Sequence, residues 1–276
     1  MVGVMTFMRC APTKLRRVQL HVLLSVLLSA VLTGCYIDTP PGDPEMVAQR
    51  LVYLLTDSDP NVRRTAAEAL GKVGHRSASA GLIFSLNDRD ASVRAAAALS
   101  LGRLGDGESG PALVERLTDS DETVRAASAV ALGAIELSTA RESQILKVLH
   151  HPQDFARIAA TRALLNLDTV SLSADLVDAL HDSDTQVRQG VVAVLGETGD
   201  GGAVPHLRSL LRTDASAGVR AEAAFRLGKI GTSDVLTDLS TIAVVDLDVG
   251  VRGWAGWAIQ QIRLSHEFGS GQPPIR

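Results

Sequence analysis

The sequence predicts an all-α fold: an α-solenoid of about seven stacked two-helix repeats, each of 31–32 residues. The first basis is self-similarity, because the stretch DSDPNVRRTAAEALGKVG from Asp57 returns 31 residues later as DRDASVRAAAALSLGRLG from Asp88. The second is composition, since 46% hydrophobic but only 3% aromatic residues indicate helices packed closely through Ala, Leu and Val. A fixed internal period outweighs length as a guide to domains, so we expect one stack. The units align on one arginine each, at intervals of 31 or 32 residues: Arg63, Arg94, Arg125, Arg157, Arg188, Arg220 and Arg252.

Residues 1–34 are expected to be a secretory signal peptide that is cleaved off. They contain no Asp or Glu, and they lead into the apolar stretch HVLLSVLLSAVLTG before Cys35. The apolar run from Val22 to Thr33 is too short for a membrane-spanning helix of about 20 residues. The basic residues of the leader are Arg9, Lys14, Arg16 and Arg17.

The last residues of this leader with the cysteine that follows, Leu32, Thr33, Gly34 and Cys35, resemble the lipobox of bacterial lipoproteins. The resemblance implies that Cys35 is lipidated and becomes the mature N-terminus; an ordinary cleaved signal with an incidental cysteine is the alternative. Tyr36 resembles the pattern of lipoproteins sorted to the outer membrane. We therefore expect a lipid-anchored protein of the cell envelope, on the periplasmic side, with the outer membrane favoured over the inner one. Residues 35–45 are expected to form a flexible tether, because prolines and a glycine prevent regular structure there.

Cysteine usage and charge exclude several classes of site. Cys10 lies in the leader and Cys35 would carry lipid, so no thiol remains for a disulfide, a zinc site or a nucleophile. Loss of the four basic leader residues would change the formal net charge from −4 to −8. Duplex nucleic acid requires a clustered basic surface, so no nucleic-acid partner is expected.

The solenoid is expected to occupy residues 46–263, with two antiparallel helices in each unit. Residues 46–57 show helical apolar spacing and represent the first helix of a unit. The second helix begins after an aspartate four residues before the arginine, as at Asp59, which is a natural N-cap. Its inward face repeats at positions −1, +3, +7 and +10 from the arginine, and glycines such as Gly74 end it. Residues 264–276 are expected to be a flexible tail.

The recurring run D-x-x-V-R-x-x-A-A-x-A-L-G-x-(L/V/I)-G resembles the HEAT repeat, in the short form of the phycobilisome-lyase-type HEAT-like family. The resemblance implies an α-solenoid that binds polypeptides along its surface. Chromophore attachment, which the family name suggests, is an analogy of fold alone. Unit four departs from the pattern at Ala156 and Leu165, and unit seven departs at Gly253 and Gly256, as a terminal cap would.

The recurring aspartates and arginines are expected to form a structural ladder. In it, each aspartate caps its helix, and each arginine bridges to an acidic turn of its own or a neighbouring unit. Calcium is not expected, because the D-x-D turns lack the further oxygen ligands, the glycine and the glutamate of an EF-hand loop. The ladder residues are Asp59, Arg63, Asp90, Arg94, Asp121, Arg125, Arg157, Asp184, Arg188, Arg220, Asp248 and Arg252.

One metal hypothesis concerns His150 and His181, which both lie seven residues before their arginines and would stack on adjacent units. A bridge across a helix spacing of about 8–10 Å would be strained. No closely spaced ligand pair such as H-x-x-x-H supports a zinc site. We therefore expect no metal.

The sequence has no G-x-S-x-G elbow, Walker loop, dinucleotide fingerprint or zinc-protease helix. Nothing in it matches a nucleophile with its base or an acid pair. We expect no catalytic residues, no cofactor and no enzymatic activity.

Positions +1, +5 and +8 from the arginine turn outward, onto the face that lines the concave side of HEAT-like solenoids. Apolar residues recur there, where a solvated face would be polar. The alternative is that tight stacking buries these positions between repeats. The predicted partner-binding stripe consists of Leu99, Val130, Ile158, Arg162, Phe225, Trp254 and Trp257.

These features predict a lipid-anchored envelope protein that acts as a non-catalytic protein–protein interaction scaffold through its concave face and is monomeric by itself. Its partner is expected to be another protein or a peptide segment. Two alternatives stay open: a structural or assembly factor of an envelope complex that binds through its convex face, and a chromophore-lyase-like enzyme.

Overall fold

The computed structural model describes residues 43–135, 139–167 and 170–268, and in these ranges every regular element is an α-helix or a 3-10 turn. The predicted signal peptide and Cys35 lie outside the described residues. No helix within those ranges is both long and apolar enough to cross a membrane. The chain divides into two compact units, Met1–Val47 and Ala48–Arg276. Only residues 43–47 of the first unit are described, so the architecture below is that of the second.

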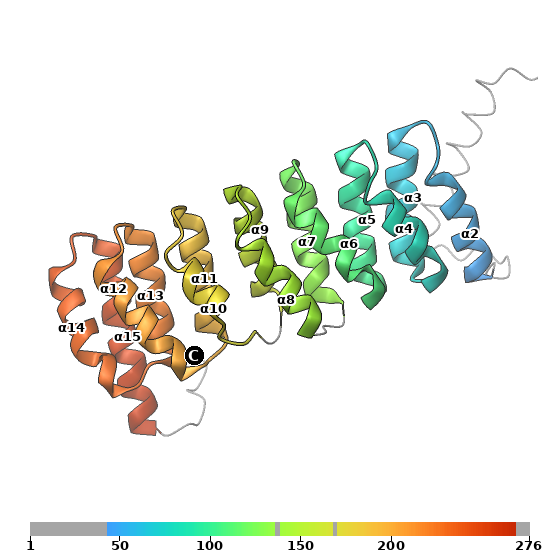
Figure 1. Ribbon diagram of the computed structural model, residues 1–276. Coiled ribbons are helices and arrows are strands. Elements are labelled where there is room, and N and C mark those ends of the chain that lie inside the picture. The colour runs from blue at the N-terminus through green and yellow to red at the C-terminus, as the bar shows by residue number, and fades with distance from the viewer. Residues whose placement is uncertain (1–42, 136–138, 168–169, 269–276) are drawn as a thin grey trace, which may run out of the picture. The chain divides into compact units, whose positions relative to one another are not determined.

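The helices follow one another in pairs, and each pair corresponds to one predicted repeat (Figure 1). The connections carry short 3-10 turns, η1 (Arg76–Ala78), η2 (Gly107–Ser109), η3 (Arg116–Thr118), η4 (Gly201–Ala203) and η5 (Ser233–Val235). The pairs are α2 (Pro44–Leu54) with α3 (Pro60–Val73), α4 (Ser79–Ser85) with α5 (Ala91–Leu104), α6 (Gly110–Glu115) with α7 (Glu122–Ala134), α8 (Thr139–Val148) with α9 (Asp154–Leu165), α10 (Ala174–Ala179) with α11 (Thr185–Glu197), α12 (Val204–Thr213) with α13 (Ala217–Ile230), and α14 (Leu236–Val245) with α15 (Val249–Phe268).

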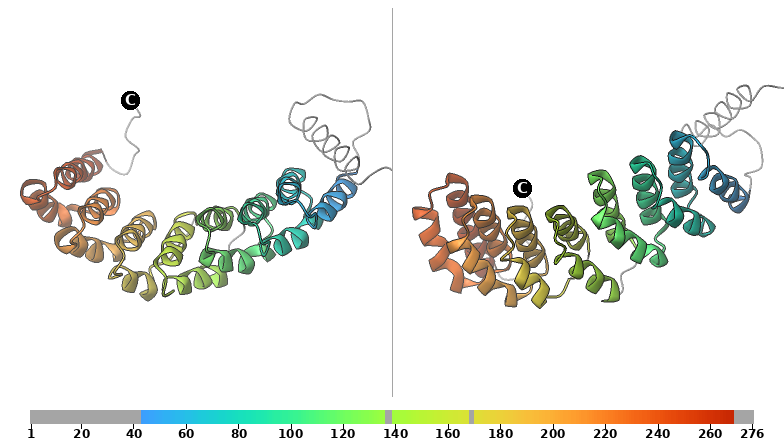
Figure 2. Two further views of the ribbon diagram at one scale, coloured as in Figure 1. Left: turned by 90° about the horizontal axis from the view of Figure 1, so that it is seen from above. Right: turned by 45° about the horizontal axis from the view of Figure 1, so that its top comes forward.

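The pairs stack into two layers. The second helices, α3, α5, α7, α9, α11, α13 and α15, each contact the next along the chain and form one layer. The first helices form the other layer, and the view from above in Figure 2 shows the two rows of helices nearly end-on. The predicted all-α solenoid is therefore confirmed.

The core lies between and within the layers, and its composition follows from the repeat. The residue at +7 from each arginine is fully buried in the first six units, and the apolar residue at −1 is buried in all seven. Apolar contacts join the +7 leucines of the first six units and the −1 valines of the last three into one continuous cluster, which a single pair could not bury alone. The +7 residues are Leu70, Leu101, Leu132, Leu164, Leu195 and Leu227.

Local signals set the helix ends. Asp90 has extended backbone, and its carboxylate accepts from the backbone N–H of Ser92, which is the expected N-cap geometry. Gly74 and Gly105 end α3 and α5 in the left-handed conformation, at φ 70° and 66°, where glycine is favoured. Gly231 also ends its helix, but in an extended conformation.

Two predicted boundaries differ from the structure. Helix α2 begins at Pro44, inside the expected tether, because proline suits the first helical turn and Asp43 accepts from the N–H of Glu45. Helix α15 runs to Phe268, beyond the expected tail boundary at residue 264, because no glycine or proline stops it before Gly269. The corrected helical region therefore spans residues 44–268, and residues 269–276 lie outside the described ranges.

Candidate functional site

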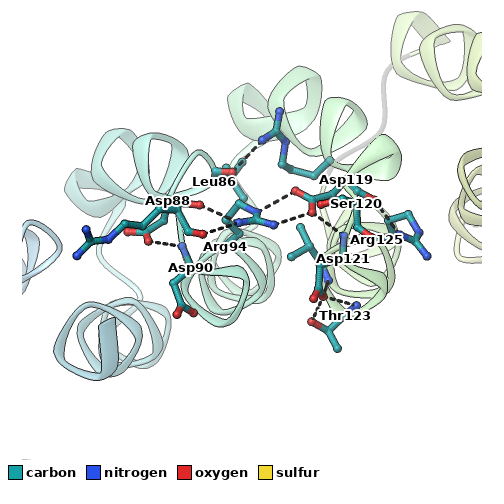
Figure 3. A network of polar contacts seen from close by, with 12 residues as sticks. Leu86, Asp88, Asp90, Arg94, Asp119, Ser120, Asp121, Thr123 and Arg125 are labelled. Atoms are coloured by element: carbon teal, nitrogen blue, oxygen red, sulfur yellow. Dashed lines mark hydrogen bonds and ion pairs between the residues drawn. The ribbon is translucent and has the colours of Figure 1, made fainter. Parts of the chain in front are cut away.

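Arg94 shows how a ladder arginine joins two units (Figure 3). Its Nε and Nη2 donate to the two carboxylate oxygens of Asp119 in the next unit, at 2.9 and 2.8 Å. Its Nη1 donates to the backbone carbonyl of Asp88 in its own turn, at 2.9 Å. One guanidinium therefore closes its own turn and holds the following one, in the fork geometry that favours arginine over lysine.

The two aspartates of each D-x-D turn have separate roles. Asp119 accepts from Arg94 and from the backbone N–H of Asp121, at 2.9 Å. Asp121 caps α7 by accepting from the backbone N–H groups of Thr123 and Val124, at 2.8 and 3.3 Å. The second aspartate is therefore the expected N-cap, and within the acidic turn it is the first aspartate that accepts the arginine of the preceding unit. The first aspartate lies six residues before its own arginine, where the preceding unit's guanidinium reaches it.

Five such bridges are present in the described ranges, each to the following unit. They are Arg63 with Asp88, Arg94 with Asp119, Arg157 with Asp182, Arg188 with Asp214, and Arg220 with Asp246, with shortest N–O distances of 2.6–2.8 Å.

Asp119 is typical of the aspartates in most of these bridges in how its charge is stabilised. Burial disfavours the charged carboxylate, but hydrogen bonds from Arg94 and from the N–H of Asp121 outweigh it, so the pKa of Asp119 is lowered. The hydrogen bond to Asp119 correspondingly raises the pKa of Arg94. Both side chains are largely buried, so the pair is screened little by salt.

The ladder is interrupted at Arg125. Its Nη1 donates to the carbonyls of Asp119 and Ser120, at 2.8 and 3.0 Å, as in the other units. The turn of unit four, however, has His151 in place of the first aspartate. The guanidinium of Arg125 instead lies 4.5 Å from the ring centroid of Phe155, a cation–π contact. The bridge predicted for Arg125 is therefore replaced by a weaker interaction.

The two histidines of the metal hypothesis, His150 and His181, lie in different surroundings. His150 Nε2 lies 2.7 Å from Asp175 Oδ1, which joins units four and five at the surface. His181 lines a shallow hollow with His206 and Asp214. In the described part of the chain, no group of three or more His, Cys, Asp or Glu side chains is placed to hold a metal ion.

The apolar stripe is exposed in part. Leu99 on α5 and Val130 on α7 expose 39% and 55% of their surface, so stacking does not bury them. Arg162 is exposed and lies 3.7 Å from Glu122 of the preceding unit, as an ion pair. Ile158, by contrast, is half-buried against the core. The residue at +5 in unit five, Ala193, is buried and interrupts the row.

At the C-terminal end of the row, three aromatic rings form one cluster. Phe225 on α13 stacks on Trp257 of α15, with ring centroids 5.1 Å apart, and Trp254 meets both rings edge-on. Lys229 lies 5.0 Å from the Phe225 ring centroid. Trp254 is 42% exposed, whereas Phe225 and Trp257 are half-buried. Apolar rings and a cation therefore share one accessible surface.

Sequence reasoning missed a polar group beside this cluster. Arg226 is buried and pairs with Glu197 of the preceding unit and with Glu222 one turn earlier on α13. It also lies over the Phe225 ring, at 5.2 Å from its centroid. The signal available in the sequence was a charged residue at position +6, which holds a small or apolar residue in the other units.

Comparison with known proteins agrees with this architecture. A family model for HEAT repeats matches residues 41–88, 79–165 and 173–260. No curated protein matches the sequence. Among solved structures, YibA of Escherichia coli is 20% identical, with 94% of this chain and 99% of that chain covered and a TM-score of 0.53.

Two further structures are similar at a lower level. A chain of the complex of CpcE and CpcF of phycocyanin lyase from Nostoc sp. PCC7120 is 21% identical, with 85% of this chain and 91% of that chain covered and a TM-score of 0.44. Human deoxyhypusine hydroxylase is 22% identical, with 80% and 97% covered and a TM-score of 0.40. At these identities the likeness concerns the fold alone. The matched repeats span most of the chain, and the protein belongs to the HEAT-repeat family.

Proposed function

We propose that this protein is a non-catalytic interaction scaffold, anchored in the bacterial cell envelope through lipid on Cys35. HEAT repeats in general mediate protein–protein interaction, and the solenoid here supports that general role. The anchor rests on the sequence, because the lipobox-like residues directly follow a basic and then apolar leader. Several acyl chains on one cysteine would hold the repeats at the periplasmic side of a membrane, with the outer membrane favoured.

The observation that carries the binding role is the aromatic cluster of Phe225, Trp254 and Trp257. Aromatic residues that are partly exposed and rigidly packed are the usual anchors of protein interfaces. Here the rings are held by α13 and α15, two adjacent helices of one layer, so they are organised before a partner arrives. A binding surface built in this way loses little side-chain entropy on association.

The chemistry of the surface suggests the kind of partner. Lys229 is exposed beside the Phe225 ring and adds a positive charge to an apolar patch. Leu99 and Val130 extend apolar surface along the same row of positions. A polypeptide with aliphatic or aromatic anchors and an acidic neighbour would complement this row.

A second candidate role rests on the other layer. Tyr53 on α2 and Phe84 on α4 are highly exposed and occupy equivalent positions, ten residues before Arg63 and Arg94. Two aromatic side chains in register would suit an assembly factor that docks through the layer of first helices. A chromophore-lyase-like activity has no such observation in its favour among the described residues.

Proximity crosslinking in envelope membranes, followed by pull-down, tests the scaffold role. The variant Leu99→Asp/Val130→Asp/Trp254→Asp places charge on three exposed side chains, so folding is expected to survive and circular dichroism checks it. The matched control is Tyr53→Asp/Phe84→Asp on the other layer. A protein that crosslinks to the native chain and the control but not to the triple variant would support the scaffold role. Loss only in the control would favour the assembly factor.

A further inference from the structure

The Asp–Arg ladder stops at each end of the stack with half of a bridge. At the C-terminal end, Arg252 donates through Nη1 to the carbonyl of Asp246 at 2.6 Å, as the other ladder arginines do in their own turns. Within the described residues, no carboxylate pairs with Arg252, and α15 is the last helix of those ranges. At the N-terminal end, Asp57 accepts from the N–H of Asp59 at 2.8 Å, but no arginine of the described ranges bridges to it. The two ends therefore carry complementary halves of one bridge.

The end face of α15 is the side that carries Gly253 and Gly256, on which the second helix of a following unit would pack. A Cβ added at Gly253 or Gly256 would meet nothing within 4 Å. In unit six, 32 residues earlier, the residue equivalent to Gly256 is Ala224, which is fully buried. The same side of α13 approaches α15 so closely that a Cβ at Gly228 would lie 2.8 Å from the Cα of Ala258. The corresponding surface of α15 is open.

The side of α14 that would face a following unit lacks the charged residues with which α12 contacts α14. Arg208 and Arg212 on α12 both reach Asp238 on α14, with N–O distances of 2.6 and 3.2 Å. The residues 32 positions later are Ser240 and Val244, both exposed. The adjoining segment is apolar and open as well, since Leu247 and Val249 are 96% and 72% exposed. Terminal repeats of solenoids ordinarily present a polar outer face, so this uncharged face of α14 requires an explanation.

The opposite end of the stack presents the matching surface. Thr65 and Ala69 on α3 are half-buried. In unit two their equivalents are Ala96 and Ser100, which are buried; the Ser100 side chain lies against Gly71 of α3, and its hydroxyl donates to the carbonyl of Ala67 at 2.8 Å. The side of α3 that carries Thr65 and Ala69 is therefore the side on which a preceding unit would pack.

We infer that a second copy of this chain stacks head-to-tail on the first and continues the solenoid between molecules. Arg252 of one copy then bridges to Asp57 of the next, and the end face of α15 packs on α3. The contact is heterologous, so an open assembly keeps a free α3 face at one end and a free α15 face at the other, and further copies can add. The inference replaces the expectation of a monomer, and it uses a face distinct from the aromatic cluster.

Sedimentation velocity of the full chain in mild detergent, over a range of protein concentrations, tests this. The native chain is expected to gain mass with concentration, beyond one chain per micelle. Asp57→Arg and Arg252→Asp are each expected to weaken association by about tenfold or more, because like charges then meet at the bridge. An equimolar mixture of the two variants is expected to associate again, since the arginine introduced at position 57 then faces the aspartate introduced at position 252. A general loss of stability could not produce that recovery.

A steric variant makes the test independent of the charged turns. Gly256→Lys is expected to fold, since a Cβ at this position meets nothing within 4 Å, and to block association. The matched control is Gly201→Lys in η4, where an added Cβ also meets nothing within 4 Å, and it should associate like the native chain. A native chain of constant single-chain mass would overturn the inference. So would a folded mixture that stays unassociated, or a Gly256→Lys variant that associates normally.

Discussion

Removing one ladder arginine should destabilise the stack by an amount that depends on whether that arginine holds a carboxylate. In Arg94→Ala, the buried carboxylate of Asp119 loses two charge-assisted hydrogen bonds, and the carbonyls of Asp88 and Arg89 lose their shared donor. Hydrogen bonds to charged groups contribute about 1.5–3 kcal/mol, and a buried charge left unpaired adds a desolvation cost. The expected loss in the free energy of unfolding is therefore about 3–4 kcal/mol.

Arg125→Ala is the matched comparison, because Arg125 makes the same contact to its own turn but faces Phe155 instead of a carboxylate. Two carbonyls lose a donor and one cation–π contact is lost, so the expected loss is about 1–2 kcal/mol. Urea unfolding followed by far-ultraviolet circular dichroism measures both values. Equal losses in the two variants, or a larger loss in Arg125→Ala, would refute the assignment of the bridge as the main contribution.

The pKa of Asp119 is lowered in the folded state, so its contribution to stability is fully present above the unfolded pKa of about 3.9 and is lost as the pH falls through the folded pKa. Asp119→Asn should therefore flatten the fall in the urea midpoint between about pH 5 and pH 2. Gly228→Ala should lower the thermal midpoint, with a cost of about 1–3 kcal/mol in the free energy of unfolding, because the new Cβ would lie 2.7 Å from the Trp257 ring. Gly256→Ala, whose Cβ meets nothing within 4 Å, should instead stabilise the protein by up to about 1 kcal/mol, and a similar decrease in both variants would contradict the packing. The chain has two tryptophans, and both contact Phe225, so Phe225→Ala should expose them to water and shift tryptophan emission to longer wavelength in the folded protein. An unchanged emission spectrum would show that the rings do not pack as described.

Substitutions inside the stack should change the free energy of unfolding, whereas substitutions at its open ends should change association. Asp119 lies inside the stack, so its replacement changes stability without changing association. Arg252 lies at the end and holds no carboxylate in the described residues, so its replacement should cost less stability and act on association. Measuring both quantities for both variants distinguishes a bridge within the chain from one between chains.

The sequence by itself determined the features that depend on neighbours a few residues apart. The arginine period of 31–32 residues identified the repeat, and the +7 leucines such as Leu70 identified the buried face, because helical periodicity is a property of the local backbone. The N-cap role of Asp90 followed for the same reason, since a cap is formed within two or three residues. Exposure of Leu99 could be suspected from its position, but the alternative of burial could not be eliminated.

Only the tertiary structure decided which groups meet across units. Asp119, rather than the cap Asp121, accepts Arg94, because the offset between adjacent units brings the guanidinium to the first residue of the next turn. Trp254 joins Phe225 although it lies at position +2 rather than +5, because the side chains packed between two neighbouring helices set which positions face each other. A repeat period states how often a contact recurs, whereas the packing of one helix on the next states which atoms make it.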